Sequence, residues 1–339
     1  MIYDVINFIL NLTFKKKINF IKLKLSYHLS SILKKPVILG YPYSLAIETT
    51  TNCNLSCPEC FSGNKLFTRP TGNMQISMYK KIINEVSPYL LYLLLYFQGE
   101  PFLHPELFTM ITLAKQKRIY TAISTNGHFF SYKNSKNTIE SGLDRIIISV
   151  DGITPDTYKI YRKGGDLQKV INGIKRLISW KKKQKSKTPY IIIQSLIMQQ
   201  NQHQKKEMYS FFKQLGVDKV VFKSMQIDQY QEGNPLMPTI EKYSRYKKKK
   251  CGSYIIKNQL KNRCWKMWSS AVVTQNGIII PCCFDKDAKY GFGNFAESSL
   301  KDIWKNNEYN KFRTGILRSR KKINICCNCT EGMNRIIIK

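Results

Sequence analysis

The sequence predicts an α/β protein built as an open or partial (β/α) barrel, followed by a small C-terminal unit of one β-hairpin and one helix. Six short apolar, β-rich runs recur between residues 44 and 227, and helical patterns separate them. Parallel neighbouring strands require such crossover connections, so the runs indicate a parallel sheet. An Asn-Gly pair between two later β-rich runs predicts the hairpin, because both residues tolerate positive φ.

The barrel is expected over residues 44–230, with ligands at the C-terminal ends of its strands. The strands are expected at Leu45–Thr50, Tyr92–Gln98, Tyr120–Ser124, Arg145–Val150, Tyr190–Met198 and Lys219–Met225. The helices are expected near 76–87, 105–117, 132–142, 167–185 and 203–215.

Two segments flank this barrel. Residues 1–43 form an apolar, lysine-dotted lead with helical spacing, which is expected to pack on the main domain; a helix that contacts a membrane surface or docks a partner is the alternative. Residues 231–258 include the charge run Lys242–Lys250 and are expected to form a solvated basic linker.

The C-terminal unit is expected over residues 259–339. Its hairpin strands are Ala271–Thr274 and Ile278–Pro281, which flank Gln275-Asn276-Gly277. A helix is expected from Ser298 or Ser299 toward Phe312, with Ser299 and Asp302 spaced as a capping pair.

Composition excludes several classes of protein. The chain has 339 residues, of which 43% are apolar, so it buries a full core and is not globally disordered. The net charge of +33 comes mainly from lysine rather than arginine, which does not favour nucleic-acid binding but does favour an acidic substrate or partner. No apolar run reaches the ~18–20 residues of a membrane span, and the N-terminus lacks the order of a secretory signal, so a cytoplasmic enzyme is expected.

The ten cysteines fall into clusters with short spacings rather than a disulfide framework. The first cluster is Cys53-Asn-Leu-Ser-Cys57-Pro-Glu-Cys60, directly after the first expected strand. Three thiolates on one tight loop hold three irons of a [4Fe–4S] cube and leave the fourth iron open to a small molecule. A structural zinc site needs a fourth ligand, for which His104 is the nearest histidine; zinc or inert thiols are the alternatives.

This loop resembles the signature of the radical S-adenosylmethionine (radical SAM) superfamily, which implies a partial (β/α)6 TIM-like barrel. The resemblance extends from Ser44 to the C-terminus. It implies that the [4Fe–4S] cluster binds Cys53, Cys57 and Cys60, and that SAM is bound by residues at successive strand ends: Gln98, Gly99 and Glu100, then Ser124 and Asn126, then Ser149 and Asp151, with Arg162 facing the SAM carboxylate. Relatives carry an aromatic residue before the third cysteine, where this chain has Glu59 and places Phe61 one position later.

The second cysteine group is Cys264-x12-Gly277-x4-Cys282 followed by Cys326-x2-Cys329. Four thiolates saturate either a [4Fe–4S] cluster or a zinc ion, and spacing does not separate the two. The group resembles the SPASM/twitch appendage of radical SAM enzymes, including Gly293-Asn294 and the stretch Ser299–Trp304. The further cysteine run of a full SPASM domain is missing, which predicts one auxiliary [4Fe–4S] cluster. Neighbouring Cys283 and Cys327 are alternative ligands, whereas Cys251 is expected to be an ordinary buried or linker cysteine.

The resemblance implies an enzyme that reductively cleaves SAM to a 5′-deoxyadenosyl radical and abstracts a hydrogen from its substrate, with an electron donor such as flavodoxin or ferredoxin. A net oxidation or crosslink of a ribosomally made peptide or protein is expected, with the auxiliary cluster as electron acceptor. The alternatives are a dehydrogenase of a small molecule such as a sugar or aminocyclitol, and a non-catalytic metal-cluster binding regulator. No catalytic acid or base is assigned: Asp285 and Tyr230 are candidates, and a structural role is the more ordinary interpretation of each.

Overall fold

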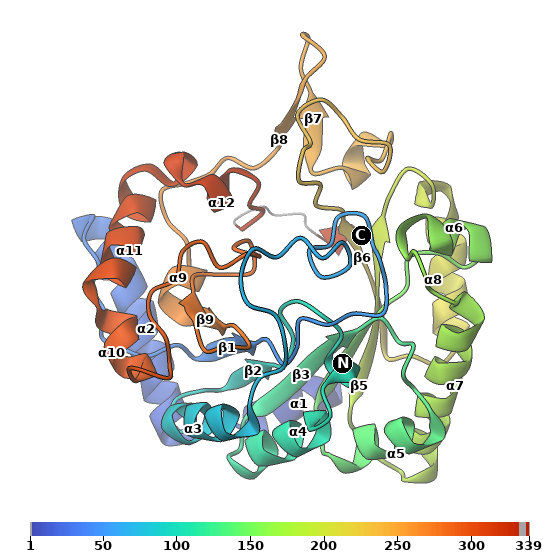
Figure 1. Ribbon diagram of the computed structural model, residues 1–339, viewed down its shortest axis with the longest axis horizontal. Helices are drawn as coiled ribbons and strands as arrows, with labels where there is room; N and C mark the ends of the chain where they lie inside the picture. Colours follow the sequence, from blue (N-terminus) through green and yellow to red (C-terminus); the bar gives the residue numbers. More distant parts are fainter. Residues whose placement is uncertain (1, 332–336, 339) are drawn as a thin grey trace.

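The computed structural model describes residues 2–331 and 337–338, which fold as an α/β protein around one large sheet (Figure 1). Within these residues the sheet has the strand order β10-β9-β1-β2-β3-β4-β5-β6-β11. Strands β1 to β6 run parallel in sequence order, so the predicted parallel (β/α) repeat is confirmed.

The barrel elements follow the predicted pattern closely. The strands are β1 (Ser44–Ile47), β2 (Tyr92–Leu94), β3 (Tyr120–Thr125), β4 (Arg145–Ser149), β5 (Tyr190–Ile197) and β6 (Lys219–Ser224). The helices are α3 (Ile76–Val86), α4 (Leu107–Gln116), α5 (Tyr132–Glu140), α6 (Pro155–Tyr161), α7 (Leu167–Lys183) and α8 (Lys205–Gln214). Helix α6 was not predicted, although the sequence carries its start signal: Thr154 caps the amide of Thr157, and Pro155 occupies the first turn.

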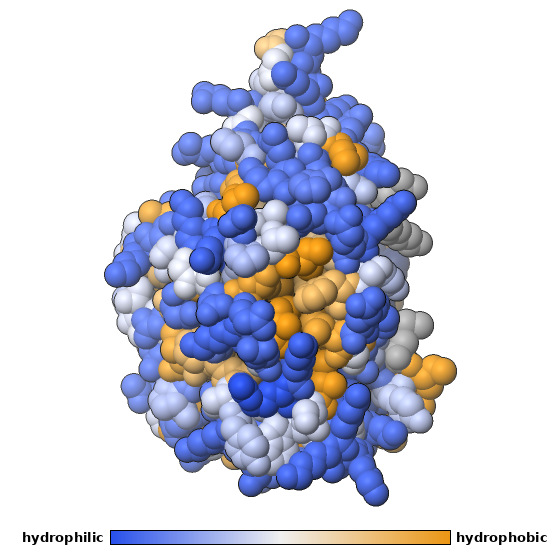
Figure 2. All heavy atoms as spheres, turned by 90° about the vertical axis from the view of Figure 1, so that its right-hand side faces the viewer, coloured by the Kyte–Doolittle hydropathy of each residue, from blue (hydrophilic) through white to orange (hydrophobic). Residues whose placement is uncertain are grey.

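Helices cover the outside of the sheet, and the side of the molecule that carries α6, α7 and α8 is mostly hydrophilic around a central hydrophobic area (Figure 2). The buried core lies between these helices and the strands, where alternate strand residues such as Leu93, Ile146 and Ile193 are fully buried. Within the described ranges, no helix combines the length and apolar character needed to cross a membrane.

The N-terminal lead forms α1 (Ile2–Leu10) and α2 (Phe14–Leu33), and both pack on the barrel. Asp4 binds Tyr120 and Arg145, and Asn7 donates a hydrogen bond to Asp144 over 2.7 Å, so α1 is fixed to residues of β3 and β4 and the turn before β4. Packing on the main domain is therefore confirmed. Several apolar side chains of both helices remain exposed, and their contact with a membrane surface or a partner stays a prediction.

The predicted C-terminal hairpin exists, but it is part of the barrel sheet. Strand β9 (Ser270–Val273) pairs in parallel with β1, in a register that places Ser44 opposite Ser270, and β10 (Ile279–Ile280) pairs antiparallel with β9. Of the Asn-Gly pair, only Gly277 has a positive φ, of 88°, and its amide closes the turn on the carbonyl of Thr274. The turn thus requires a positive φ at Gly277 and not at Asn276.

The helical part of this unit is more divided than predicted. It consists of α9 (Lys266–Ser269), α10 (Leu300–Lys305), α11 (Asn307–Ser319) and α12 (Asn324–Cys327), while β11 (Ile337–Ile338) pairs antiparallel with β6. The capping pair is confirmed, because Ser299 accepts the amide of Asp302. The expected single helix breaks at Asn306, whose side chain accepts the amide of Tyr309 and starts α11.

The charge run Lys242–Lys250 is not simply a solvated linker. It contains β7 (Tyr246–Lys248), which pairs antiparallel with β8 (Tyr254–Ile256) in a hairpin that projects from the molecule (Figure 1). Tyr243 to Tyr246 are buried, whereas Lys242 and the lysines from Lys247 to Lys250 are exposed. Cys251 is exposed at the hairpin tip, contrary to the expectation of a buried residue but compatible with that of a linker cysteine.

Candidate active site

The loop that carries Cys53, Cys57 and Cys60 follows β1, and hydrogen bonds to its backbone fix its shape. Asn64 donates hydrogen bonds to the carbonyls of Cys57 and Cys60, over 2.9 and 3.1 Å, and the amide of Ser56 binds the carbonyl of Lys163 after α6. All three thiols line one cavity of about 320 Å³. The sequence does not indicate this role of Asn64, because it depends on how the loop folds back on itself.

The same cavity collects the side chains predicted at successive strand ends. Of the eight predicted SAM-binding residues, seven line it together with the three cysteines: Gln98, Gly99, Glu100, Ser124, Asn126, Ser149 and Arg162. The eighth, Asp151, is fully buried behind Arg162 and is not part of the lining. Tyr96 also lines the cavity and had not been predicted, because an aromatic residue after a buried strand is more often part of the core.

Glu100 is a buried carboxylate with three donors around it. Thr125 Oγ1 lies 2.7 Å from one carboxylate oxygen, the amide of Asn126 lies 2.8 Å from the other, and the amide of Phe102 also donates to the carboxylate. Burial raises the pKa of Glu100 to about 7, although these hydrogen bonds and the positive charge of Arg162 lower it. A cationic ligand at this carboxylate therefore favours its ionised form.

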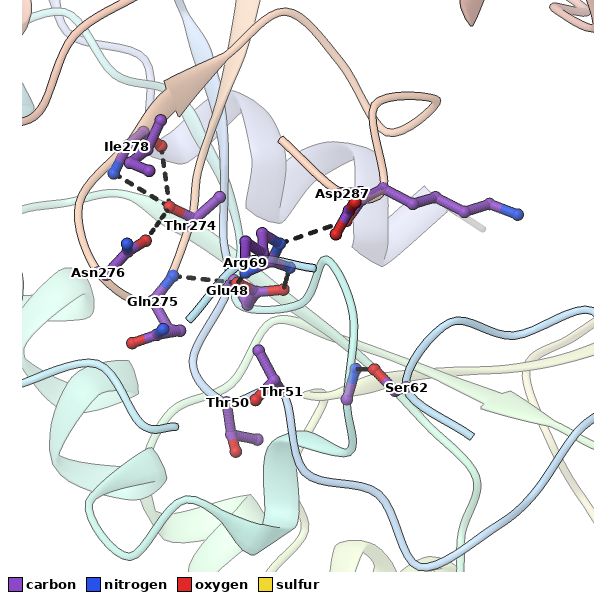
Figure 3. Close-up of polar contacts among 12 residues, drawn as sticks. Glu48, Thr50, Thr51, Ser62, Arg69, Thr274, Gln275, Asn276, Ile278 and Asp287 are labelled. Atoms are coloured by element: carbon purple, nitrogen blue, oxygen red, sulfur yellow. Dashed lines mark hydrogen bonds and ion pairs between the residues drawn. The ribbon is translucent and has the colours of Figure 1, made fainter. Parts of the chain in front are cut away.

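Gly99 is required by the close passage of two backbones. Its φ is +73°, and a Cβ at this position would lie 2.2 Å from the carbonyl oxygen of Thr50. The amide of Gly99 donates to Ser62 of the cysteine loop over 2.8 Å (Figure 3). The Gly99 backbone thus fixes the distance between the end of β2 and the cysteine loop.

Asp151 positions Arg162 rather than facing the cavity. The Nε of Arg162 lies 2.6 Å from Asp151, whose other oxygen accepts the amide of Leu196. Arg162 also lies 3.9 Å from the Sγ of Cys57. Asp151 does not line the cavity, because its carboxylate binds Arg162 and the β5 backbone, and its part in holding SAM stays a prediction.

Glu59, at the position where relatives carry an aromatic residue, binds the segment after β6. Its carboxylate accepts the amide of Asp228 over 2.9 Å and the side-chain amide of Asn234 over 3.2 Å. It thereby ties the cysteine loop to the segment after β6. Phe61 lies outside the site cavity and lines a neighbouring one.

The four auxiliary cysteines converge from three segments of the C-terminal unit. Cys264, Cys326 and Cys329 are buried, and Cys282 is half-buried. Burial raises the pKa of Cys264 to about 12 and that of Cys326 to about 11, so iron must displace protons from these thiols. Arg320 is buried among them, and its guanidinium lies 3.1 Å from the Sγ of Cys329.

The alternative ligands differ from each other. Cys327 is exposed and donates to carbonyls of Lys321 and Ile323, so it points back along its own segment. Cys283 is also exposed, but its charge is the largest cause of the raised pKa of Lys266, and the charge of Cys282 also contributes. Cys282 and Cys283 thus lie on the same side of the unit, and the preference for Cys282 stays a prediction.

A buried polar network joins the two cysteine regions (Figure 3). Glu48, directly after β1, forms a bidentate ion pair with Arg69 over 2.6 and 2.8 Å and accepts the amide of Gln275 from the β9–β10 turn. Asp287 accepts the amide of Thr68 over 2.8 Å. The loop with the first cysteines and the hairpin region with Cys282 are therefore held in one fixed arrangement.

Comparisons with known proteins agree with this geometry. Residues 47–193 match the radical SAM superfamily model, and residues 264–330 match SPASM, an iron–sulfur cluster-binding domain; together these ranges cover more than half of the chain. The chain belongs to the radical SAM superfamily.

Two curated relatives align with this radical SAM protein over most of both chains. The tungsten-containing aldehyde ferredoxin oxidoreductase cofactor-modifying protein of Pyrococcus furiosus is 26% identical over 79% of this chain and 82% of its own. The S-adenosyl-L-methionine-dependent 2-deoxy-scyllo-inosamine dehydrogenase of Niallia circulans is 22% identical over 85% of this chain and 92% of its own.

A solved structure shows the same fold. Streptococcus suis SuiB bound to S-adenosylmethionine has a TM-score of 0.62 and 15% identity, and the alignment covers 81% of this chain and 68% of that chain. SuiB has also been solved with its precursor peptide SuiA bound.

The radical SAM and SPASM domains imply a [4Fe–4S] cluster and SAM in the barrel and auxiliary iron–sulfur clusters in the C-terminal unit, so these cofactor predictions are confirmed. The donor set fits the first cluster, because three cysteines line the cavity and no other cysteine, histidine or methionine is among its described lining residues. Within the described part of the chain, no three ligand side chains meet at a point suited to one metal ion. A cubane cluster places one cysteine on each iron, so it accepts such wider spacing. The number of auxiliary clusters stays a prediction.

Proposed function

We propose that this protein is a radical SAM oxidoreductase that abstracts a hydrogen from its substrate and transfers an electron of the resulting radical to the auxiliary cluster. The observation that carries the proposal is the single cavity that brings together the three loop cysteines, Glu100 and Arg162. When bound, the reduced cluster and SAM supply a 5′-deoxyadenosyl radical.

The residues of this chain bind and orient SAM. The carboxylate of Glu100 is expected to bind the methionyl ammonium, and Arg162, held by Asp151, is expected to bind the carboxylate. Asn126 is fixed by Asn54 and His128 and lies 3.9 Å from the Sγ of Cys53, which suits a contact beside the cluster. Holding SAM in one orientation limits where the radical forms.

The substrate class is proposed as a small molecule, with a peptide or protein side chain as the second candidate. The two relatives that align over most of their own length are named for modification of a cofactor and for dehydrogenation of an aminocyclitol. Two structures with a bound peptide align over 67% of that chain for SuiB and 88% of that chain for anSMEcpe, so a peptide stays the second candidate.

The test is replacement of Cys53, Cys57 and Cys60 together by Ala. Anaerobically reconstituted wild-type protein should hold about eight irons, from one cluster in each cysteine group, and should form 5′-deoxyadenosine when reduced. The triple variant should lose about half of the iron and all 5′-deoxyadenosine. Cys251→Ala is the matched control, because that thiol is exposed at a distant hairpin tip. SAM cleavage by the triple variant would contradict the proposal.

A further inference from the structure

The cavity has a second region that SAM binding does not explain. Besides the cysteines and the SAM-binding candidates, it is lined by Lys223 and Ser224 at the end of β6, by Arg245 before β7, and by Lys286 from the auxiliary hairpin region. These four residues come from three separate segments of the chain, and no sequence motif singles them out. They are called the cationic side of the cavity below.

The carboxylates in and beside the cavity form hydrogen bonds or ion pairs with groups other than Lys223, Arg245 and Lys286. Glu59 accepts hydrogen bonds from the segment after β6, and Glu100 accepts three hydrogen bonds from Phe102, Thr125 and Asn126. Asp151 does not line the cavity and forms an ion pair with Arg162 over 2.6 Å. Among the described residues, no carboxylate forms an ion pair with Lys223, Arg245 or Lys286.

Arg245 and Ser224 each carry a buried polar atom that makes no hydrogen bond with the described residues. Arg245 is 6% exposed, and one of its amino groups donates to the carbonyl of Ser224 over 2.5 Å. Its Nε and the hydroxyl of Ser224 are buried and make no hydrogen bond within the described residues. A buried guanidinium with an unsatisfied N–H is costly, so Arg245 at the cavity wall points to a ligand that accepts this hydrogen bond.

The cationic side lies toward the auxiliary cysteines. Burial lowers the pKa of Lys223 and of Arg245, while the negative charge of a Cys283 thiolate raises the pKa of both. The negative charge of Cys329 also raises the pKa of Arg245, whereas Arg162 lies 3.9 Å from the Sγ of Cys57. The auxiliary cysteines have their own cations, since Arg320 contacts Cys329 directly. Lys223 and Arg245 thus line the cavity of the first cysteine group and also interact electrostatically with auxiliary cysteines, as a substrate-binding region of the proposed reaction requires.

We propose that the cationic side binds an oxyanion group of the substrate, a phosphate or a carboxylate, through Lys223, Ser224 and Arg245. This inference rests on the proposed function, because it names the substrate class of the same site. The planar fork of Arg245 suits two oxygens of one anion, and the Lys223 ammonium and the Ser224 hydroxyl add further donors. SAM carries a single carboxylate, which Arg162 is expected to bind, so the cationic side remains for the substrate.

The test uses anaerobically reconstituted protein with SAM bound. Binding of inorganic phosphate and of malonate is measured separately by calorimetry and by the shift of the thermal unfolding midpoint, at constant ionic strength. The wild type should bind one of them saturably, and preference for phosphate or for malonate tells which oxyanion the substrate carries. Arg245→Gln and Lys223→Met should each weaken this binding at least tenfold, and Arg245→Lys should restore it in part.

The matched control is Lys247→Met, which removes one exposed lysine from the β7–β8 hairpin and should leave anion binding unchanged. Without anion, Lys223→Met should unfold at a higher temperature than wild type, because it removes an uncompensated charge from a partly buried site. Absence of saturable anion binding, or equal weakening by Lys247→Met, would overturn the inference.

The same wild-type preparation separates this inference from the proposed function. Reductive formation of 5′-deoxyadenosine without saturable anion binding would refute the oxyanion site and leave the radical SAM activity standing. Anion binding without 5′-deoxyadenosine formation would refute the activity and leave the binding site standing.

Discussion

Replacement of Glu100 by Gln is expected to weaken SAM binding in a pH-dependent way. The carboxylate is 1% exposed, and burial raises its pKa to about 7. The methionyl ammonium of SAM favours the ionised carboxylate, so the interaction is present above pH 7 and is lost as the pH falls below it. Gln keeps the shape and one acceptor oxygen but carries no charge at any pH.

The magnitude follows from this burial. A charge-assisted hydrogen bond is worth roughly 1.5–3 kcal/mol, so at pH 8 the Glu100→Gln variant should bind SAM about 10- to 100-fold more weakly than wild type. At pH 6 the wild-type carboxylate is mostly protonated, which costs about 1.4 kcal/mol per pH unit below 7. The difference between the two proteins should therefore shrink by about tenfold from pH 8 to pH 6, and most of this change on a logarithmic scale should lie below pH 7.

The assay is anaerobic calorimetry of SAM binding to both proteins between pH 6 and 8. Titration of SAM itself is common to the two proteins and cancels in their difference. Glu106→Gln, on a half-buried side chain that precedes α4 and lies outside the cavity, is the matched control and should bind SAM as wild type does. Equal affinity of Glu100→Gln and wild type at pH 8 would refute the assignment of Glu100, and parallel pH curves would place the titrating group elsewhere.

Three further predictions concern the auxiliary cysteines and the network beside them. Cys282→Ala should leave 5′-deoxyadenosine formation largely intact and block the oxidised product, as measured by chromatography; full product formation, or the same defect in Cys283→Ala instead, would contradict the choice of Cys282. Arg320→Gln should lower the reduction potential of the auxiliary cluster, because a buried positive charge beside Cys329 stabilises the more negative reduced state; an unchanged potential in a redox titration would contradict this role. Arg69→Met should lower the free energy of unfolding by about 3–5 kcal/mol, because it leaves the fully buried Glu48 unpaired. In denaturant titrations the double variant with Glu48→Gln should recover part of that loss, and equal stability of Arg69→Met and wild type would refute the argument.

The sequence predicted what depends on local pattern. The alternation of strands and helices, the Ser299 cap and the close spacing of Cys53, Cys57 and Cys60 are all encoded within a few neighbouring residues, and the structure places them as expected. Strand ends of a parallel barrel meet at one edge, so predicted residues such as Glu100 could be placed in one site before any coordinates existed. The boundaries of the predicted domains and the roles of individual site residues stay predictions.

The rest depends on tertiary contacts that leave no local signal. Asp151 was expected among the SAM-binding residues, and the sequence does not show that its carboxylate binds Arg162 after the next helix. Lys242–Lys250 appeared to be a solvated run, yet Arg245 within it is buried against Ser224, which no charge pattern reveals. Tyr96 also gave no signal, since its exposure to the cavity depends on how β2 ends.

The pairing of β9 with β1 has a consequence for the order in which the protein assembles. Ser44 enters the sheet early during synthesis, but its partner Ser270 leaves the ribosome much later, so the edge of β1 stays open over that interval. The loop with Cys53 also lacks its contacts to Lys286 and Asp287 until then. Iron should therefore be inserted stably at the first site only after the C-terminal unit has docked, and a barrel expressed without that unit should aggregate through the unpaired edge of β1.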